Sequence, residues 1–322
     1  MTKIAIEEHY LYEPLRSYVP SLPKRADVAK KNIDRLLDVG EERIELMDRA
    51  GIDIAVLSHS FNGLQGVTSV PEAIALARAA NDALAEQIAG NDRFEGFAVL
   101  PMQDPEAAAA ELHRATRELG LVGALVNGYT DTASGEALYY DMPEYRLFWA
   151  ELESLDVPLY LHPRFSPPGQ LHAYDTYPFL RAGAFGFGVE CALHSLRLML
   201  SGVFDAHPGL KIVLGHLGET LPFILHRTAV RMKDVESPNQ EPVTHYLHRN
   251  FHITTSGIFN VPSLIGALLE MGGDRILFAT DYPYESMEES SAWLDDLPIS
   301  PDQRRKIAYD NACKLFGLEK RA

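Results

Sequence analysis

The stretch KIAIEEH, residues 3–9, is a short apolar run that ends in two glutamates and a histidine. Similar apolar runs, most of which close on polar residues, recur at seven more places along the chain, at 52–60, 94–102, 121–128, 157–163, 210–219, 250–257 and 275–283. Near-continuous apolar runs of this length are typical of parallel strands that are buried on both faces. The sequence therefore predicts eight such strands.

The segments between these runs predict amphipathic helices. Residues 43–51 and 71–90 each end in glycine, a common helix stop, and residues 105–120 begin with a proline that suits a first helical turn. Strands that alternate with helices indicate an α/β protein, because parallel strands need long crossover connections. Eight such units predict a (β/α)8 barrel, the TIM-barrel fold.

Two connections are longer than a plain crossover requires, residues 10–42 after the first strand and residues 164–190 after the fifth. Both contain prolines and aromatic residues. Long ordered loops on a barrel serve as lids or partner contacts, and a surface insertion without a catalytic role is an equal alternative. No linker rich in Pro, Gly or Ser interrupts the chain, so we expect residues 1–322 to form a single domain.

Composition excludes several classes of partner. The formal net charge of −16 repels phosphate backbones and anionic lipid, so we expect no nucleic-acid and no membrane partner. No apolar run approaches the ~20 residues that span a bilayer, and MTKIAIEEHY lacks the regions of a signal peptide. Two cysteines without CxxC spacing exclude a disulfide framework and suit a reducing, cytoplasmic location.

Polar residues gather at the ends of the predicted strands, which converge at one mouth of a barrel, where catalytic groups of this fold lie. Glu7 and His9 are two apart on a strand and point to the same side. With His162 and Asp281 they offer two nitrogens and two carboxylates, a set that suits one divalent Zn²⁺ or Mn²⁺ with positions left for substrate or water. His59, at the mouth end of the second predicted strand, is a candidate pocket residue.

The chain resembles the amidohydrolase superfamily, specifically its aromatic-acid decarboxylases of the γ-resorcylate and 2,3-dihydroxybenzoate type. The resemblance covers essentially the whole chain and is carried by long strings, namely IEEHY, LPMQDP, GALVNG, LYLHPR, LRLMLSGVFDAHPGLKIVLGHLGETLPF, NFHITTSG and DRILFATDYPYE. The strand-1 motif of most amidohydrolases is His-x-His, whereas Glu7-x-His9 occurs here. The benzoate decarboxylases share this departure, which counts against an ordinary hydrolase.

The resemblance implies roles for individual residues. Glu7, His9, His162 and Asp281 match the metal ligands of the family. His216 and Glu219 match a relay that contacts the aspartate, and the resemblance makes all three catalytic candidates, with Asp281 as the donor of a proton. Asn127 and Arg227 match positions that contact substrate oxygens in the family, and they join His59 as candidate substrate-binding residues. The relatives form homodimers or homotetramers, and we expect the same here.

The expected activity is that of a carboxy-lyase: a metal-dependent, non-oxidative and reversible decarboxylation of an ortho-hydroxybenzoate, such as 2,6- or 2,3-dihydroxybenzoate. Protonation of the ring carbon before CO₂ leaves avoids an aryl carbanion. The partner is then a small aromatic carboxylic acid. The alternatives are a metal-dependent hydrolase of a lactone or amide, a decarboxylase of a non-aromatic acid, and an inactive barrel that serves as a scaffold or binding protein.

Overall fold

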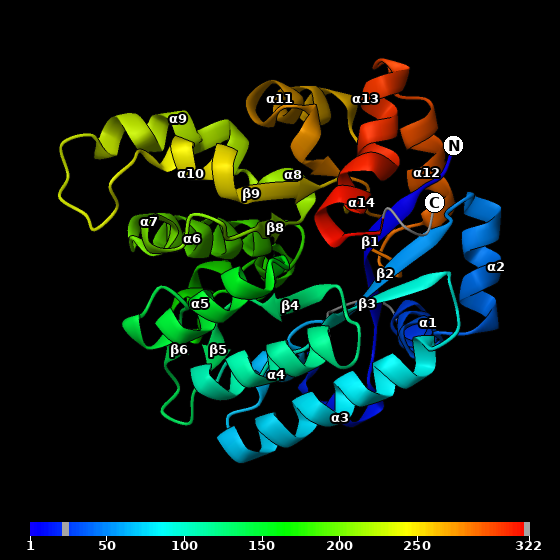
Figure 1. Ribbon diagram of the computed structural model, residues 1–322, viewed down its shortest axis with the longest axis horizontal. Coiled ribbons are helices and arrows are strands. Elements are labelled where there is room, and N and C mark those ends of the chain that lie inside the picture. Colours follow the sequence, from blue (N-terminus) through cyan, green and yellow to red (C-terminus); the bar gives the residue numbers. More distant parts are fainter. Residues whose placement is uncertain (21–25, 319–322) are drawn as a thin grey trace.

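A computed structural model describes residues 1–20 and 26–318, and its central feature is a sheet whose parallel strands follow chain order (Figure 1). The eight strands are β1 (Ile4–Tyr10), β2 (Ile54–His59), β3 (Phe94–Ala98), β4 (Gly123–Asn127), β7 (Leu159–His162), β8 (Ile212–Leu214), β9 (Phe251–Thr254) and β10 (Ile276–Leu277). A parallel bridge joins Ile6 of β1 to Ala279 beyond β10, and the Ile6 amide donates to the Phe278 carbonyl at 3.1 Å. The sheet thus closes, and the predicted (β/α)8 barrel is confirmed.

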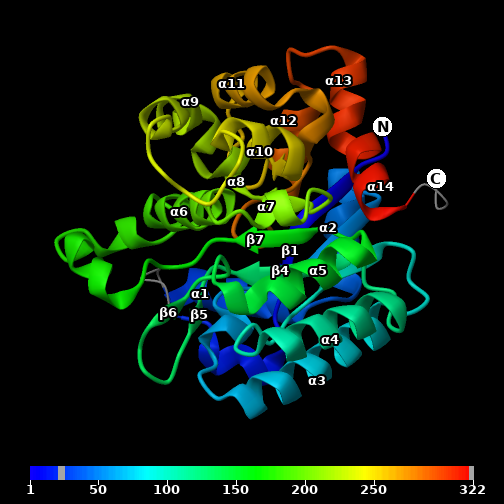
Figure 2. The same ribbon diagram turned by 60° about the vertical axis from the view of Figure 1, so that its left-hand side comes forward.

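Helices surround these strands (Figures 1 and 2). The longer ones are α2 (Glu41–Ala50), α3 (Val70–Ile88), α4 (Pro105–Arg117), α5 (Arg146–Leu155), α6 (Gly186–Leu200), α9 (Leu221–Met232), α10 (Val243–Asn250), α11 (Val261–Met271) and α12 (Met287–Asp295). Shorter ones are α7 (Val203–Ala206), α8 (His216–Glu219), α13 (Pro301–Arg305) and α14 (Asn311–Phe316). Gly51 ends α2 in a left-handed conformation with φ of 65°, as the sequence predicts.

Apolar side chains fill the barrel interior and close one of its ends. Ile4, Val56, Leu125 and Val213 belong to one buried cluster inside the strands. The cluster continues into α14 through Phe316 and its neighbours, which cover the N-terminal end of the barrel. The polar ends of the strands therefore face the opposite mouth, the usual location of an active site in this fold.

Most predicted strands end earlier than the sequence indicates, and the difference is largest in two of them. The run 210–219 becomes α8 after Leu214, and the run 275–283 leaves the sheet soon after Leu277. In both places the backbone turns into the left-handed region, at His216 with φ of 49° and at Asp281 with φ of 65°. Apolar content alone therefore overestimates the length of these strands.

The two long connections contain short helices. Residues 10–42 include η1 (Glu13–Tyr18), α1 (Ala26–Leu37) and the start of α2, and residues 164–190 include η4 (Pro168–Tyr174), η5 (Pro178–Arg181) and the start of α6. A hairpin of β5 (Thr130–Asp131) and β6 (Ala137–Leu138), which the sequence did not indicate, follows β4. The remaining short turns are η2 (Gly63–Gly66), η3 (Pro143–Tyr145), η6 (Gly273–Arg275) and a π-turn, η7 (Lys306–Asp310). Among the described residues, no helix has the length and apolar character to cross a membrane.

Candidate active site

Five side chains converge at the open mouth of the barrel, from β1, from β7 and from the segments that follow β8 and β10. Glu7 Oε1 lies 3.4 Å from His162 Nε2, 4.0 Å from His9 Nε2 and 3.9 Å from His216 Nε2. Asp281 Oδ1 lies 3.4 Å from His9 Nε2. The ligand atoms of Glu7, His9 and His162, and those of Glu7, His216 and Asp281, each fall within 4.8 Å of one another. The spacing of both groups suits a shared cation.

An irregular backbone directs the side chains of these residues toward the mouth of the barrel. The pairing of β1 with β2 shifts register between Ile6 and Glu8, so that Glu7 occupies a bulge. The φ values of Glu7, His216, Glu219 and Asp281 are all positive, between 49° and 65°. Non-glycine residues rarely adopt this conformation, and each instance costs about 1–3 kcal/mol. Such residues concentrate at functional sites, where the surrounding structure enforces them.

Buried polar atoms in this cluster lack partners. Glu7 Oε1 and His9 Nε2 are fully buried and have no hydrogen-bond partner among the described residues. The other carboxylate oxygen of Glu7 accepts hydrogen bonds from Tyr160 Oη and from Thr254 Oγ1, the latter at 3.3 Å. An unpartnered buried charge is costly, and a cation relieves it. Two imidazole nitrogens with carboxylate oxygens form a donor set that fits a divalent first-row metal.

Electrostatics place a proton on His216. Burial lowers the pKa of His216, but the charges of Glu219 and Glu7 outweigh burial and raise this pKa well above its ordinary value. Burial raises the pKa of Asp281, but the imidazoles of His216 and His9 outweigh burial and hold this pKa below its ordinary range. Burial also raises the pKa of Glu7. The favoured state is therefore a protonated His216 between carboxylates.

His216 connects the cluster to a second carboxylate. Its Nδ1 donates to Glu219 Oε1 at 2.6 Å, and its Nε2 faces Asp281 Oδ2 at 3.7 Å. The backbone amide of His216 donates to Ser256 Oγ at 3.0 Å, which fixes the start of α8. The geometry thus forms a line from Glu219 through an imidazole to Asp281, along which a proton can move.

An aromatic cavity of about 310 Å³ opens above these polar groups. His162, His216 and Asp281 line its polar side, and Phe61 and Phe187, whose ring centroids are 5.2 Å apart, line its apolar side. Tyr284 completes the wall and its hydroxyl lies 2.6 Å from Ser60 Oγ. The cavity combines an apolar wall for a flat ring with a polar floor.

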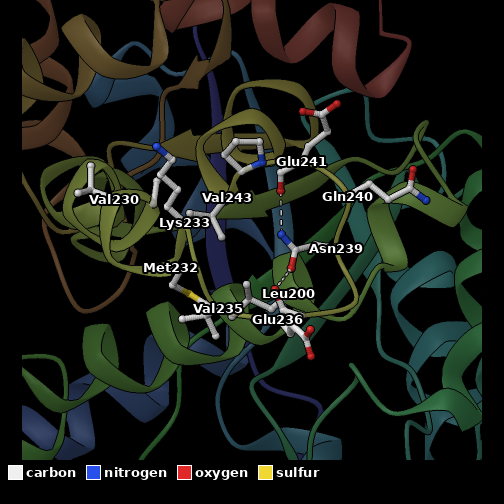
Figure 3. A pocket seen from close by; sticks show the side chains of 13 residues that line it. Leu200, Val230, Met232, Lys233, Val235, Glu236, Asn239, Gln240, Glu241 and Val243 are labelled. Carbon is white, nitrogen blue, oxygen red and sulfur yellow. Dashed lines mark hydrogen bonds between the residues drawn. The ribbon is translucent and has the colours of Figure 1, made fainter.

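A larger cavity of about 720 Å³ lies elsewhere, at the end of α9 and the loop that leads to α10 (Figure 3). Its lining includes Leu200, Val235 and Val243, and Asn239 Nδ2 donates there to the Glu241 carbonyl at 2.8 Å. Neither metal-ligating group of the barrel mouth contributes to this lining. The chemistry therefore points to the smaller cavity.

Comparison with known proteins agrees with this geometry. The family model described as amidohydrolase matches residues 35–318. The chain belongs to the amidohydrolase family. It is 46% identical over 326 residues to the γ-resorcylate decarboxylase of Rhizobium radiobacter, covering 99% of each chain.

Solved members of the family have the same architecture. The crystal structure of a 2,6-dihydroxybenzoate decarboxylase complexed with 2,6-dihydroxybenzoate matches with a TM-score of 0.94 and 45% identity, over 98% of this chain and 99% of the other. The dihydroxybenzoic acid decarboxylase of Polaromonas sp. JS666, with bound manganese and the inhibitor 2-nitroresorcinol, matches with a TM-score of 0.93 and 43% identity, over 98% and 97%.

Three residues that the sequence assigned to substrate binding lie outside the lining of the cavity in this family member. His59 and Asn127 are buried beside η2, where an added Cβ on Gly63 would lie 2.8 Å from His59 Nδ1 and 3.4 Å from Asn127 Nδ2. Burial lowers the pKa of His59 to about 4, so its ring is neutral. Arg227 is exposed on α9. The pairing of β4 with β7 places Asn127 opposite His162, and a role of His59, Asn127 and Arg227 in substrate binding stays a prediction.

Other residues of the site were not anticipated. Tyr160 lies two positions before His162 on β7, a spacing that directs both side chains inward, so alternation along the strand was a usable signal. Phe61 lies in the connection after β2, where no periodic pattern indicates the direction of a side chain, and Phe187 lies in the first turn of α6.

Proposed function

We propose that the protein is a metal-dependent, non-oxidative decarboxylase of an ortho-hydroxybenzoate, with 2,6-dihydroxybenzoate as the first candidate substrate. The observation that carries this proposal is the convergence of Glu7, His9, His162 and Asp281 under an aromatic cavity. It is supported by the end-to-end similarity to γ-resorcylate decarboxylases. Phe61 and Phe187 line the apolar wall against which a flat ring would pack, with its carboxylate toward the polar floor.

The four residues Glu7, His9, His162 and Asp281 would hold one divalent ion, either Zn²⁺ or Mn²⁺. Manganese is the ion bound in the Polaromonas relative. When bound, such an ion acts as a Lewis acid and template that neutralises the charge of the substrate's oxygens. This neutralisation matters here because the chain carries a net charge of −16.

The chain's own residues perform the proton transfer. His216 holds a proton and faces Asp281, and Asp281 delivers that proton to the ring carbon that bears the carboxylate. The new C–H bond forms first, and the C–C bond then breaks with its electron pair returning to the ring, so that CO₂ leaves and aromaticity is restored. Glu219 keeps the His216 ring oriented for this transfer.

A variant of Phe187 tests whether the aromatic wall of the cavity binds the ring of the substrate. Replacing Phe187 by alanine should raise KM for the benzoate about 10- to 100-fold, because the ring loses an apolar contact of ~1–3 kcal/mol. The expected loss in kcat is smaller, since no proton-transfer group changes. Steady-state kinetics measure both constants. Phe223→Ala, at an exposed apolar position on α9, is the matched control and should leave KM unchanged. An unchanged KM in Phe187→Ala would remove this residue from the substrate pocket.

Further aspects of this function remain proposals. We keep His59, Asn127 and Arg227 as candidate substrate contacts. A cytoplasmic location is supported by the two cysteines, Cys191 and Cys313, which are buried and form no disulfide. A homodimer or homotetramer is supported by exposed apolar residues at 177–185, among them Tyr177 and Phe185 at 68% and 58% exposure. A single domain is supported by a main apolar cluster that runs from Ala5 to Ala308.

Release of CO₂ from a panel of acids tests the proposed function. The panel contains 2,6-dihydroxybenzoate, 2,3-dihydroxybenzoate, salicylate, orsellinate and 5-carboxyvanillate, with a lactone as control, each assayed with and without a chelator. Chelator-sensitive CO₂ release from an ortho-hydroxy acid is the expected result. Lactone hydrolysis that incorporates labelled water oxygen, without CO₂ from any acid, would favour the hydrolase alternative.

A further inference from the structure

The hydrogen bonding between β1 and the segment after β10 is irregular at the metal-ligating residues. The backbone bond that closes the barrel lies at Ile6, and a second backbone bond joins the His9 amide to the Tyr282 carbonyl at 2.8 Å. Between these two bonds, Glu7 and Asp281 each have a φ of 65°, a value outside the range of extended strands. Side-chain contacts between the two segments therefore influence how the ligands lie relative to one another.

The side chain of Glu8 makes such a contact. Its Oε1 accepts a hydrogen bond from the Thr280 amide at 3.0 Å, and its Oε2 accepts one from the Thr280 hydroxyl at 2.6 Å. Both residues are 0% exposed. Glu8 lies between Glu7 and His9 in the chain, and Thr280 directly precedes Asp281. Two bonds to one residue fix its direction as well as its distance, so this pair joins the two ligand-bearing segments firmly.

A buried arginine accounts for a carboxylate at this depth. Glutamate is almost never fully buried unless it is paired. Arg43 on α2 is also 0% exposed, and its charge attracts the Glu8 carboxylate. Its Nη2 donates to the His9 carbonyl at 2.7 Å, and its guanidinium lies 4.8 Å from the centroid of the Tyr282 ring. Arg43 thus contacts the same two segments that Glu8 joins.

We propose that Glu8 is a positioning residue that holds Asp281 in place relative to Glu7 and His9, and so sets the geometry of the metal-ligating group. This proposal rests on the proposed decarboxylase function. Asp281 Oδ1 lies 3.4 Å from His9 Nε2, and a displacement of Thr280 moves Asp281 with it. Misplacement of a reacting group by about 1 Å costs ~10²-fold in rate. Glu8 does not line the cavity, so its influence on the reaction passes through Asp281.

The variant Glu8→Ala tests this role because it removes both bonds to Thr280 and keeps every ligand. We expect the affinity for Mn²⁺, measured by competition with a chelator, to fall about 10- to 100-fold, as for other residues that support ligands. With the metal site saturated, kcat for CO₂ release should fall by a similar factor, while KM stays close to that of the wild type. The electron paramagnetic resonance spectrum of the Mn²⁺-loaded variant, which reports the arrangement of the ligands, should change.

The variant Glu8→Gln separates position from charge. Its side-chain carbonyl accepts from the Thr280 amide while its NH₂ group donates to the Thr280 hydroxyl, so both contacts survive without the negative charge. We expect this variant to retain most of the Mn²⁺ affinity, the wild-type spectrum and most of kcat. If it instead behaves like Glu8→Ala, the charge of Glu8 and not its hold on Thr280 matters, and the proposal is overturned.

Thr280→Val tests the same contact from its other end. It removes only the hydroxyl bond, so we expect smaller losses of Mn²⁺ affinity and kcat than in Glu8→Ala. Added to Glu8→Ala, it should cause little further loss, because the hydroxyl has already lost its partner. Losses that simply add in the double variant would contradict the proposed contact. If Glu8→Ala fails to fold, Thr280→Val decides alone, and a wild-type affinity, spectrum and kcat would overturn the proposal.

Glu111→Ala is the matched control for the loss of a buried glutamate. Glu111 is 3% exposed, accepts hydrogen bonds from Asn81 and Arg114, and belongs to neither metal-ligating group. Its removal should lower Tm but leave the Mn²⁺ affinity, the spectrum and kcat unchanged. Wild-type Mn²⁺ affinity and spectrum in Glu8→Ala would overturn the role of Glu8. A wild type that binds Mn²⁺ but releases no CO₂ would instead overturn the proposed function, while the affinity and the spectrum still test Glu8.

Discussion

Replacement of Asp281 by asparagine should abolish decarboxylation while the protein still binds its metal. The amide retains an oxygen ligand beside His9 but cannot carry a proton to the ring carbon. General acid catalysis contributes about 10²–10⁴-fold to a rate, so we expect kcat to fall by at least that factor. The assay is CO₂ release at saturating substrate, together with metal content by elemental analysis of the purified protein.

The interpretation of this variant depends on its control. Asp295→Asn changes an aspartate on α12 that pairs with Lys3 and is about half exposed, so it should keep the wild-type rate. Substantial turnover by Asp281→Asn with bound metal would remove Asp281 as proton donor. Loss of the metal in that variant would instead show that Asp281 is needed mainly as a ligand.

Removal of a metal-ligating histidine should reduce CO₂ release as strongly as Asp281→Asn, but through loss of metal binding. His9→Ala deletes one imidazole from the buried group that includes Glu7 and His162. Mutations of residues that only support ligands already weaken metal binding about 10- to 100-fold, so loss of a ligand should exceed this. We expect CO₂ release to fall to background and metal affinity, measured by competition with a chelator, to fall by more than 100-fold.

The chain offers a matched histidine for this experiment. His252 lies on β9, where burial lowers the pKa of its ring to about 3, and it belongs to neither metal-ligating group. His252→Ala should keep both metal and activity. If His9→Ala still bound metal with wild-type affinity, the cation would not be held by the group that contains Glu7 and His162.

Much of the fold was predictable because buried parallel strands leave a direct trace in the sequence. All eight predicted strands occur, and helix ends such as Gly51 follow from glycine's freedom at positive φ. The lengths of the last strands were not predictable, since the run 275–283 stays apolar through Ala279 although β10 ends at Leu277. The hairpin β5–β6 is only two residues per strand, too short for a periodic signal.

The site was predictable where side chains lie at strand ends and not where they lie in connections. Glu7, His9 and His162 converge as expected, although a bulge at Glu7, and not plain alternation, shapes this part of β1. Phe61 reaches the cavity from an irregular segment whose course depends on tertiary contacts. The exposed position of Arg227 on α9 is likewise a property of the whole fold and not of the local sequence.

The left-handed backbone at four site residues lowers the stability of the folded protein, but the side chains at these positions are needed for turnover. The residues are Glu7, His216, Glu219 and Asp281. Glycine adopts this conformation without steric cost, so glycine at any of these positions would relax the native backbone while deleting a functional side chain. A library screened only for survival at high temperature would therefore enrich inactive barrels. Engineering a more thermostable variant of this protein requires that activity be screened in every round, or that these four positions be kept fixed.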